Sequence, residues 1–213
     1  MQAKLLESNK ANGIIEALFE LYPNAKYYLN FNTPIELVVA SILSAQTRDE
    51  IVNKLTVELF SKYKDCDAFS NATKEDMLKY IKSVSFADKK AENITKTCNE
   101  IKSRYNGVVP RNMDKLLMLP GIGRKTANTI LINAYGVVEG IPVDTWVIKL
   151  SNRIGLSQSN NANIIEEDLK SKVNKKYWKN LAYVLKAHGK TICGNVPKCD
   201  VCKVSKLCMK NGV

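Results

Sequence analysis

Four of the six cysteines lie close together near the end of the chain, in the run CGNVPKCDVCKVSKLC. Cys193, Cys199, Cys202 and Cys208 have the spacing C-x5-C-x2-C-x5-C. Thiols this close more often bind a metal than form disulfides where the compartment is reducing. Zinc and an iron–sulfur cluster both accept four thiolates, and the spacing does not decide between them. The loop would present Lys198, Lys203 and Lys206 from a rigid frame.

The stretch MLPGIGRKTAN (residues 118–128) places a turn directly before a helical pattern. Glycines at 121 and 123 let a phosphate approach the backbone, and the first N–H groups of the following helix point outward toward it. Lys125 lies in the first helical turn, where the macrodipole disfavours an ammonium ion and favours a nucleophilic neutral amine. The alternative is a plain turn between two helices with solvated charges.

A carboxylate follows nineteen residues later, in VDTWV. Asp144 is placed to cap the next helix, which would hold its carboxylate in a defined orientation. Capping alone is the competing explanation for this residue. A nearby carboxylate could also raise the lysine pKa by pairing, and the sequence leaves open which effect is larger.

Apolar residues recur at helical spacing along most of the chain, and strand-like alternation is almost absent. TPIELVVASILSAQ begins with Thr33 as N-cap, Pro34 at the first helical position and Glu36 at the capping-box position. The connections are short and no repeat or long linker is present. An all-α fold of about ten helices is expected. Similar capped, amphipathic stretches cover residues 47–63, 71–84, 89–105, 112–119, 124–136, 143–156 and 163–173.

The net charge is +11, and most of it lies in residues 171–213, which contain ten lysines and a single acid, Asp200. Clustered cations favour a polyanionic partner because they displace the counterions condensed on phosphates; a solubilising surface is the alternative. The longest apolar run, residues 37–43, is too short to span a bilayer, and the polar start lacks the core of a signal peptide. A cytoplasmic protein without membrane contact is expected, nucleoid-associated if the source is prokaryotic.

Five sequence blocks together resemble the endonuclease III family of helix-hairpin-helix DNA glycosylases. They are TPIELVVASILSAQTRD, LPGIGRKTAN, VDTWVIKLSNRIGL, HGKTIC and the cysteine run, in the family's order over nearly the whole chain. The resemblance implies two all-α lobes with a DNA-binding cleft between them. The lobes would be a helical barrel domain at 27–137, with the helix-hairpin-helix at about 113–133, and an iron-sulfur domain from 1–26 plus 138–213. The resemblance also implies a 4Fe-4S cluster rather than zinc in the loop 193–208.

The resemblance further implies the roles of single residues. Lys125 matches the lysine that attacks the sugar and forms an imine, and Asp144 the aspartate that stabilises positive charge on the sugar. Gln46 matches the residue that fills the space left by an extruded base. Phe86 takes the place of the apolar wedge, although a partly buried core aromatic is the alternative. The expected DNA contacts of the hairpin and cluster loop come from Gly121, Ile122, Gly123, Arg124, Lys198 and Lys203.

The expected function is therefore a bifunctional DNA glycosylase and AP lyase that removes oxidised pyrimidines from duplex DNA. Its expected partner is double-stranded DNA with damaged bases or abasic sites, bound by a monomer. Related glycosylases for purines or mismatches are an alternative, although the adenine-mismatch branch usually lacks the lysine and the 8-oxoguanine branch usually lacks the cluster. A non-catalytic DNA-binding iron-sulfur protein is a further alternative that would need neither Lys125 nor Asp144.

Three positions depart from the family pattern. Five residues rather than six separate Cys193 from Cys199, and Ser85, Phe86 and Ala87 replace the usual glycine-containing turn. Trp146 stands where the family usually has histidine, and this ring is expected to reshape the base pocket. His188, the only histidine, is expected to be structural, and Cys66 and Cys98 are expected to be buried apolar side chains.

Overall fold

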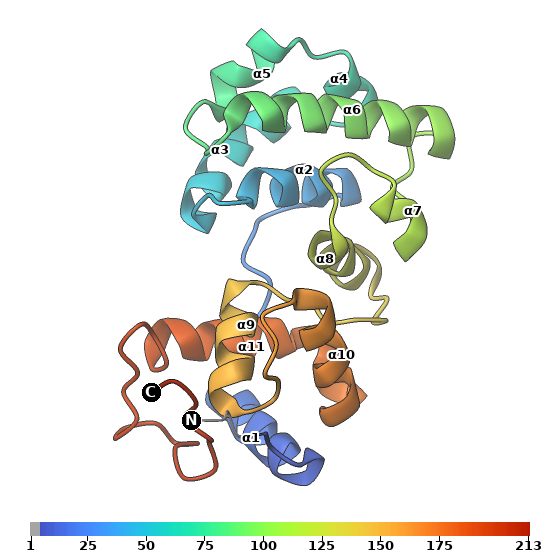
Figure 1. The fold of residues 1–213 in the computed structure, drawn as a ribbon. Helices are drawn as coiled ribbons and strands as arrows, with labels where there is room; N and C mark the ends of the chain where they lie inside the picture. The colour runs from blue at the N-terminus through green and yellow to red at the C-terminus, as the bar shows by residue number, and fades with distance from the viewer. Residues whose placement is uncertain (1–4) are drawn as a thin grey trace. The chain divides into compact units, whose positions relative to one another are not determined.

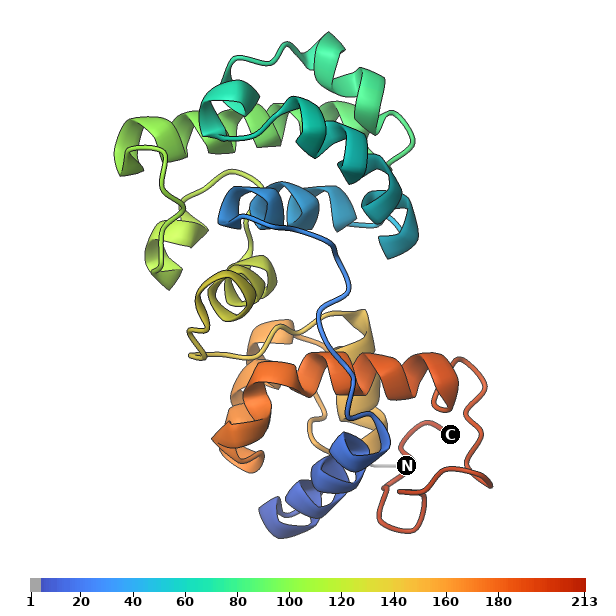
Figure 2. The same ribbon diagram turned by 180° about the vertical axis from the view of Figure 1, so that it is seen from behind.

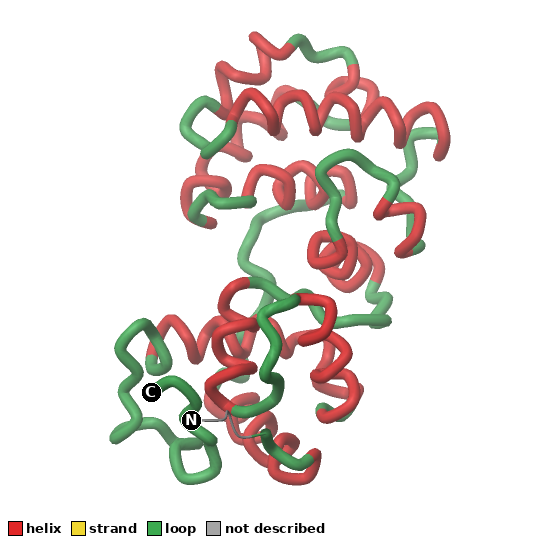
Figure 3. Tube along the Cα trace, viewed as in Figure 1, coloured by secondary structure: helices red, strands yellow, loops and turns green. Residues whose placement is uncertain are grey.

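The structure is a computed structural model that describes residues 5–213. The described part of the chain consists of helices joined by loops, without a β-strand (Figure 3). An isolated β-bridge joins Cys193 and Pro197. The all-α prediction is confirmed. None of the helices in the described residues is long and apolar enough to cross a membrane.

The chain divides into two compact units, one formed by residues 28–137 and the other by the chain on both sides of it. The unit 28–137 is arranged around α2 (Pro34–Ser44), whose residues 35–43 are all buried. This helix contacts α3, α6 and α8, which explains why its sequence is apolar on every face (Figure 1). The other helices of this unit are α3 (Asp49–Lys62), α4 (Cys66–Ser70), α5 (Lys74–Ile81), α6 (Ala87–Tyr105), α7 (Met113–Leu117) and α8 (Arg124–Tyr135).

The second unit combines an N-terminal helix with the C-terminal part of the chain. Its central helix is α11, whose residues 181–186 are buried and which packs against α1 and α9 (Figure 2). The loop 192–213 follows α11. The helices of this unit are α1 (Ser8–Leu21), α9 (Thr145–Ile154), α10 (Ala162–Lys172), η1 (Lys175–Tyr177) and α11 (Trp178–Thr191).

The helix starts agree in part with the sequence rules. Thr33 caps α2 by accepting a hydrogen bond from the Glu36 amide, and the Glu36 carboxylate accepts one from the Asn32 amide at 2.6 Å. Three of the stretches expected to be capped lack a side-chain cap, because Arg48, Phe86 and Gly123 precede α3, α6 and α8. Arginine and phenylalanine have no short acceptor for the first-turn amides, and glycine has no side chain.

The isolated cysteines are buried, as the sequence predicts. Cys66 lies on α4 and Cys98 on α6, and their thiols hydrogen-bond to each other. The two residues therefore pack as a pair, which their separation of more than thirty positions in the chain did not suggest. The hydrogen bond with Cys66 and, to a lesser extent, burial raise the pKa of the Cys98 thiol, so this group behaves as an apolar side chain in the core.

Candidate active site and metal centre

The hairpin before α8 is held by α6. Gly121 has φ +79°, a conformation that favours glycine, and a Cβ there would lie 3.1 Å from the Asn93 side chain. The Thr97 hydroxyl donates a hydrogen bond to the carbonyl of Pro120 at 2.5 Å, and Ile122 is buried. The turn is therefore anchored on its inner side by a buried isoleucine and by two polar residues of one long helix.

Gly123 has a different role from Gly121. Its φ is −95°, which any residue can adopt, and a Cβ at this position would meet no atom within 4 Å. Gly123 is the N-cap of α8 and supplies no side-chain cap. A glycine here leaves the start of the helix uncovered, so an anion can approach the first-turn amides closely.

Lys125 is the second residue of α8, in the first turn as the sequence predicts. It is partly buried, and its carbonyl accepts a hydrogen bond from the Thr129 hydroxyl at 2.9 Å. Arg124 and Thr126 beside it are also partly buried. The helix fixes the backbone of this lysine directly after the hairpin.

Asp144 is the N-cap of α9, so the capping prediction is confirmed. Its Oδ1 atom accepts hydrogen bonds from the amides of Trp146 and Val147, each at 2.9 Å. Two amide donors at the start of the helix hold the carboxylate group in a fixed orientation. Lys125 belongs to the unit 28–137 and Asp144 to the other unit.

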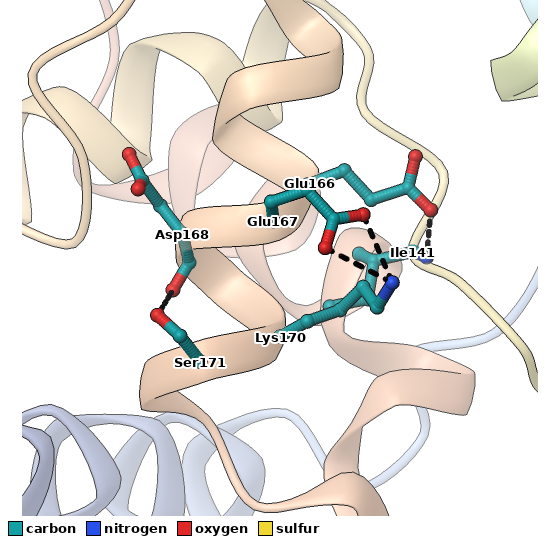
Figure 4. A network of polar contacts seen from close by, with 6 residues as sticks. All are labelled: Ile141, Glu166, Glu167, Asp168, Lys170 and Ser171. Carbon is teal, nitrogen blue, oxygen red and sulfur yellow. Dashed lines mark hydrogen bonds and ion pairs between the residues drawn. The ribbon is translucent and has the colours of Figure 1, made fainter.

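The segment that leads to Asp144 is held by a residue that the sequence analysis missed. Glu166, on α10, is 2% exposed, and its Oε1 atom accepts a hydrogen bond from the amide of Ile141 at 3.3 Å (Figure 4). Its neighbour Glu167 instead pairs with Lys170 at the surface. Helical periodicity could have indicated that Glu166 is buried, because Glu166 lies on the same face of the helix as Leu169 and Val173.

Gln46 and Phe86 lie in two turns of the same unit, one after α2 and one before α6. Both residues are exposed and both have positive φ, at 53° and 56°. The Ser85 hydroxyl donates to the Gln46 carbonyl at 2.8 Å, which ties the two turns together. The phenyl group of Phe86 is 66% exposed, so the alternative of a partly buried core aromatic is wrong.

The four clustered cysteines line one pocket in the loop after α11, together with Arg153 and His188. All four are free thiols. Burial raises the pKa of Cys202 and Cys208, and a bound cation would supply the charge that thiolates need. Among the described residues, no group of three or more side chains is arranged to hold a single metal ion as it stands.

A half-buried arginine on α9 and a buried histidine on α11 support this loop. The Arg153 guanidinium donates hydrogen bonds to the carbonyls of Cys193, Gly194 and Asn195. His188 is 3% exposed, with its Nδ1 3.1 Å from the Tyr22 hydroxyl and its Nε2 3.7 Å from the Cys202 sulfur. His188 thus contacts a predicted ligand, which agrees with a structural role. Lys198, Lys203 and Lys206 are exposed on the same loop.

Trp146 lies in the first turn of α9, two residues after Asp144. Its ring packs against the backbone of α11, where a Cβ on Gly189 would lie 2.3 Å from the ring carbon Cε3. The Lys149 ammonium lies 5.3 Å from the ring centre and also donates to Asn195 at 2.7 Å. Trp146 therefore contributes to the packing between α9 and α11. The physical reason is that glycine at 189 leaves room for the indole.

Gly189→Ala is expected to destabilise the protein by about 2 kcal/mol, because the new methyl group overlaps the Trp146 ring. Urea denaturation monitored by circular dichroism measures this change. Gly13→Ala is a matched control within α1, since a Cβ there meets no atom within 4 Å, and it should stabilise by about 0.5–1 kcal/mol. In the Trp146→His background the cost of Gly189→Ala should shrink; an undiminished cost would contradict the packing.

Comparison with known proteins identifies the class. Residues 39–175 match the family described as HhH-GPD superfamily base excision DNA repair protein. Endonuclease III of Synechocystis sp. is 39% identical over 95% of this chain and 93% of its own length. Endonuclease III of Escherichia coli is 36% identical over 92% of each chain. A thermostable thymine-DNA glycosylase, 24% identical with a TM-score of 0.84, has the same fold.

A solved structure of a trapped covalent intermediate of endonuclease III with DNA has a TM-score of 0.91 and 33% identity, with 96% of each chain covered. The all-α fold and the matched family define a helix-hairpin-helix protein of base excision repair. Within that class, the chain belongs to the endonuclease III family and is a DNA glycosylase.

Proposed function

We propose that the protein is a bifunctional glycosylase and AP lyase that uses Lys125 as its nucleophile. The observation that carries the proposal is the position of Lys125 in the first turn of α8, directly after an uncapped hairpin, in a chain similar to an endonuclease III trapped covalently on DNA. A nearby helix N-terminus favours the neutral amine over the ammonium ion. A neutral lysine amine can attack a carbon that bears a leaving group.

In the proposed reaction the Lys125 nitrogen attacks C1′ of the damaged nucleotide and the bond from C1′ to the base breaks. The base leaves with the bonding electron pair and takes up a proton. The C1′–O4′ bond then breaks, O4′ takes up a proton, and the lysine nitrogen forms a protonated imine with C1′. Loss of a proton from C2′ breaks the C3′–O bond by β-elimination, and the phosphate leaves with the bonding electrons. Water then hydrolyses the imine and restores the amine. The strand is cut on the 3′ side of the lesion.

Asp144 has two proposed tasks, and they use the same carboxylate. Its Oδ1 caps α9 through two amides, which fixes the group at the start of that helix. The negative charge stabilises the positive sugar as the base leaves and assists proton transfer. The proposed role of Glu166 is indirect. Its carboxylate accepts a hydrogen bond from the Ile141 amide and so holds the segment that precedes Asp144.

DNA would be held mainly through its backbone and then opened at the lesion. The proposed phosphate contacts come from the hairpin, at Gly121, Ile122, Gly123 and Arg124, and from the exposed Lys198 and Lys203 of the cluster loop. Reaching C1′ requires extrusion of the base, since stacked bases hide that carbon. Gln46 would fill the vacated space, and the exposed ring of Phe86 would stack as the wedge.

The donor set of the cysteine loop fits a 4Fe-4S cluster, with zinc as the alternative. Four free thiols face one pocket, and Arg153 and His188 already satisfy the loop backbone and one sulfur. Such a cluster would crosslink the loop 193–208 and so fix the lysines on it. No step of the reaction requires it, and its role would be structural.

The substrate class can be tested with matched duplexes that carry thymine glycol, dihydrouracil, uracil or 8-oxoguanine. We expect base release and strand cutting with the first two, and rates at least about tenfold lower with the others. Single-turnover gel assays measure these rates. Trp146→His should leave the order unchanged because that ring packs on α11. Preferential release of 8-oxoguanine or of mismatched bases would favour the related purine or mismatch branches instead.

A further inference from the structure

The most unusual buried group outside the proposed reaction centre is the side chain of Lys90. It lies in the first turn of α6 and is only 5% exposed, although lysine is rarely buried without a partner. Its partners are three uncharged oxygens: the carbonyls of Leu43 and Ala45, at 2.7 and 2.6 Å, and the Thr47 hydroxyl at 3.0 Å. The three hydrogens of the ammonium group match these three acceptors.

The acceptors of Lys90 belong to the end of α2, where the chain leaves the helix. The last carbonyls of a helix lack helical partners, and here a side chain from α6 satisfies two of them. A cation at a helix C-terminus is also favoured by the macrodipole. Burial lowers the pKa of Lys90 to about 8, so the ammonium form still predominates at pH 7. Lys90 thus fixes the point where the turn that carries Gln46 begins.

The same contacts extend to the turn that carries Phe86. The Thr47 hydroxyl, which accepts from Lys90, also accepts from the Ser85 amide at 3.2 Å. The Ser85 hydroxyl donates to the Gln46 carbonyl, and the Phe86 carbonyl accepts from the Lys90 amide at 3.0 Å. One connected set of hydrogen bonds therefore joins the two turns through Lys90, Thr47 and Ser85.

The two residues carried by these turns have a backbone conformation that is unfavourable for residues with a side chain. Gln46 and Phe86 have positive φ, a conformation that is strained for a bulky side chain such as phenylalanine. Such a conformation persists only when surrounding contacts enforce it. The exposed side chains gain no compensating burial, so the contacts beneath them must supply the constraint.

We propose that Lys90 is a positioning residue that holds the Gln46 and Phe86 turns as one preorganised element for opening the duplex at the lesion. This inference rests on the proposed function, in which Gln46 and Phe86 enter the duplex beside the extruded base. Lys90 itself contacts no reacting atom. Its effect is on the step in which the base leaves the stack, before Lys125 attacks.

The test compares single-turnover excision of the same lesion from a fully paired duplex and from a duplex in which the lesion has no opposing base. Extrusion is costly in the first substrate and cheap in the second. Lys90→Met should lower the ratio of the paired to the unpaired rate by about 10- to 100-fold, because the displaced turns no longer support extrusion. Lys89→Met removes an exposed lysine from the same helix and should leave the ratio unchanged.

The outcomes separate this inference from the proposed function. Equal losses of rate on both substrates would mean that Lys90 is merely structural and would overturn the inference. If wild-type protein excises the lesion from neither duplex, the proposed function fails as well. Should Lys90→Met not fold, Thr47→Val and Ser85→Ala break the link at its other members and should lower the same ratio. An unchanged ratio in both of these variants would also overturn the inference.

Discussion

Lys125→Ala should lose the covalent protein–DNA adduct that borohydride traps on an abasic-site duplex. Borohydride reduces an imine between the lysine nitrogen and the sugar, and alanine provides no amine to form one. The rate of strand cutting should fall by at least about 10³-fold, since the nucleophile itself is removed. Denaturing gel electrophoresis of the trapped mixture measures both the adduct and the cut strand.

Two further variants distinguish the effect of the Lys125 amine from the effects of neighbouring charged residues. Arg124→Ala removes the neighbouring cation in the same helical turn and should weaken DNA binding while an adduct still forms. Asp144→Asn keeps an oxygen that can cap α9, so the fold should survive while base release slows. Wild-type protein that never forms an adduct, or a Lys125→Ala protein that still does, would refute the assigned nucleophile.

Lys125→Ala is also expected to fold normally, which makes its kinetics interpretable. The residue is partly buried in the first turn of α8, and alanine is a better helix former than lysine. Thermal melting of the variant should therefore match wild type within a few degrees. A large fall in melting temperature would point to lost structure rather than lost chemistry.

Cys202→Ser should abolish the yellow-brown colour expected of the purified protein and its iron and sulfide content. One missing thiolate leaves a cluster iron without its protein ligand, and the loop 193–208 loses the crosslink that fixes it. We expect the melting temperature to fall by roughly 10 °C or more, since loss of a structural metal group costs several kcal/mol. Absorption spectra, metal analysis and thermal melting measure these changes.

Cys66→Ser is the control for this variant, because Cys66 is a buried thiol outside the loop. Replacing it should lower stability through the core while the colour and metal content remain. Colourless wild-type protein with stoichiometric zinc would reject the cluster and support the alternative metal. A Cys202→Ser protein that keeps its full iron content would reject Cys202 as a ligand.

The positions of the two proposed catalytic residues could be predicted because they depend on local rules. A turn with two glycines before a helical pattern places Lys125 in a first helical turn, and an aspartate before a helix start serves as its N-cap. Such rules act over four or five residues, so they can be recognised in a sequence. The cysteine run is local for the same reason.

The same local rules failed where a distant residue decides the conformation. Phe86 is the N-cap of α6 in a left-handed conformation, although the sequence suggested an ordinary capped start. The ring of Trp146 packs against a glycine on another helix, which no neighbour of Trp146 in the chain indicates. Neither outcome could be obtained from the neighbours of these residues in the chain.

The sequence by itself determined the helical architecture, the family, the hairpin that carries Lys125, the cap at Asp144 and the set of four thiols. Only the tertiary structure decided that Lys90 binds the carbonyl of Leu43, 47 positions away in the chain, that Glu166 holds the segment before Asp144, and that Gly189 accommodates Trp146. The physical reason is the distance along the chain over which each kind of interaction acts. Helical periodicity and capping act between near neighbours, whereas a buried polar group is satisfied by whichever residues packing brings to it.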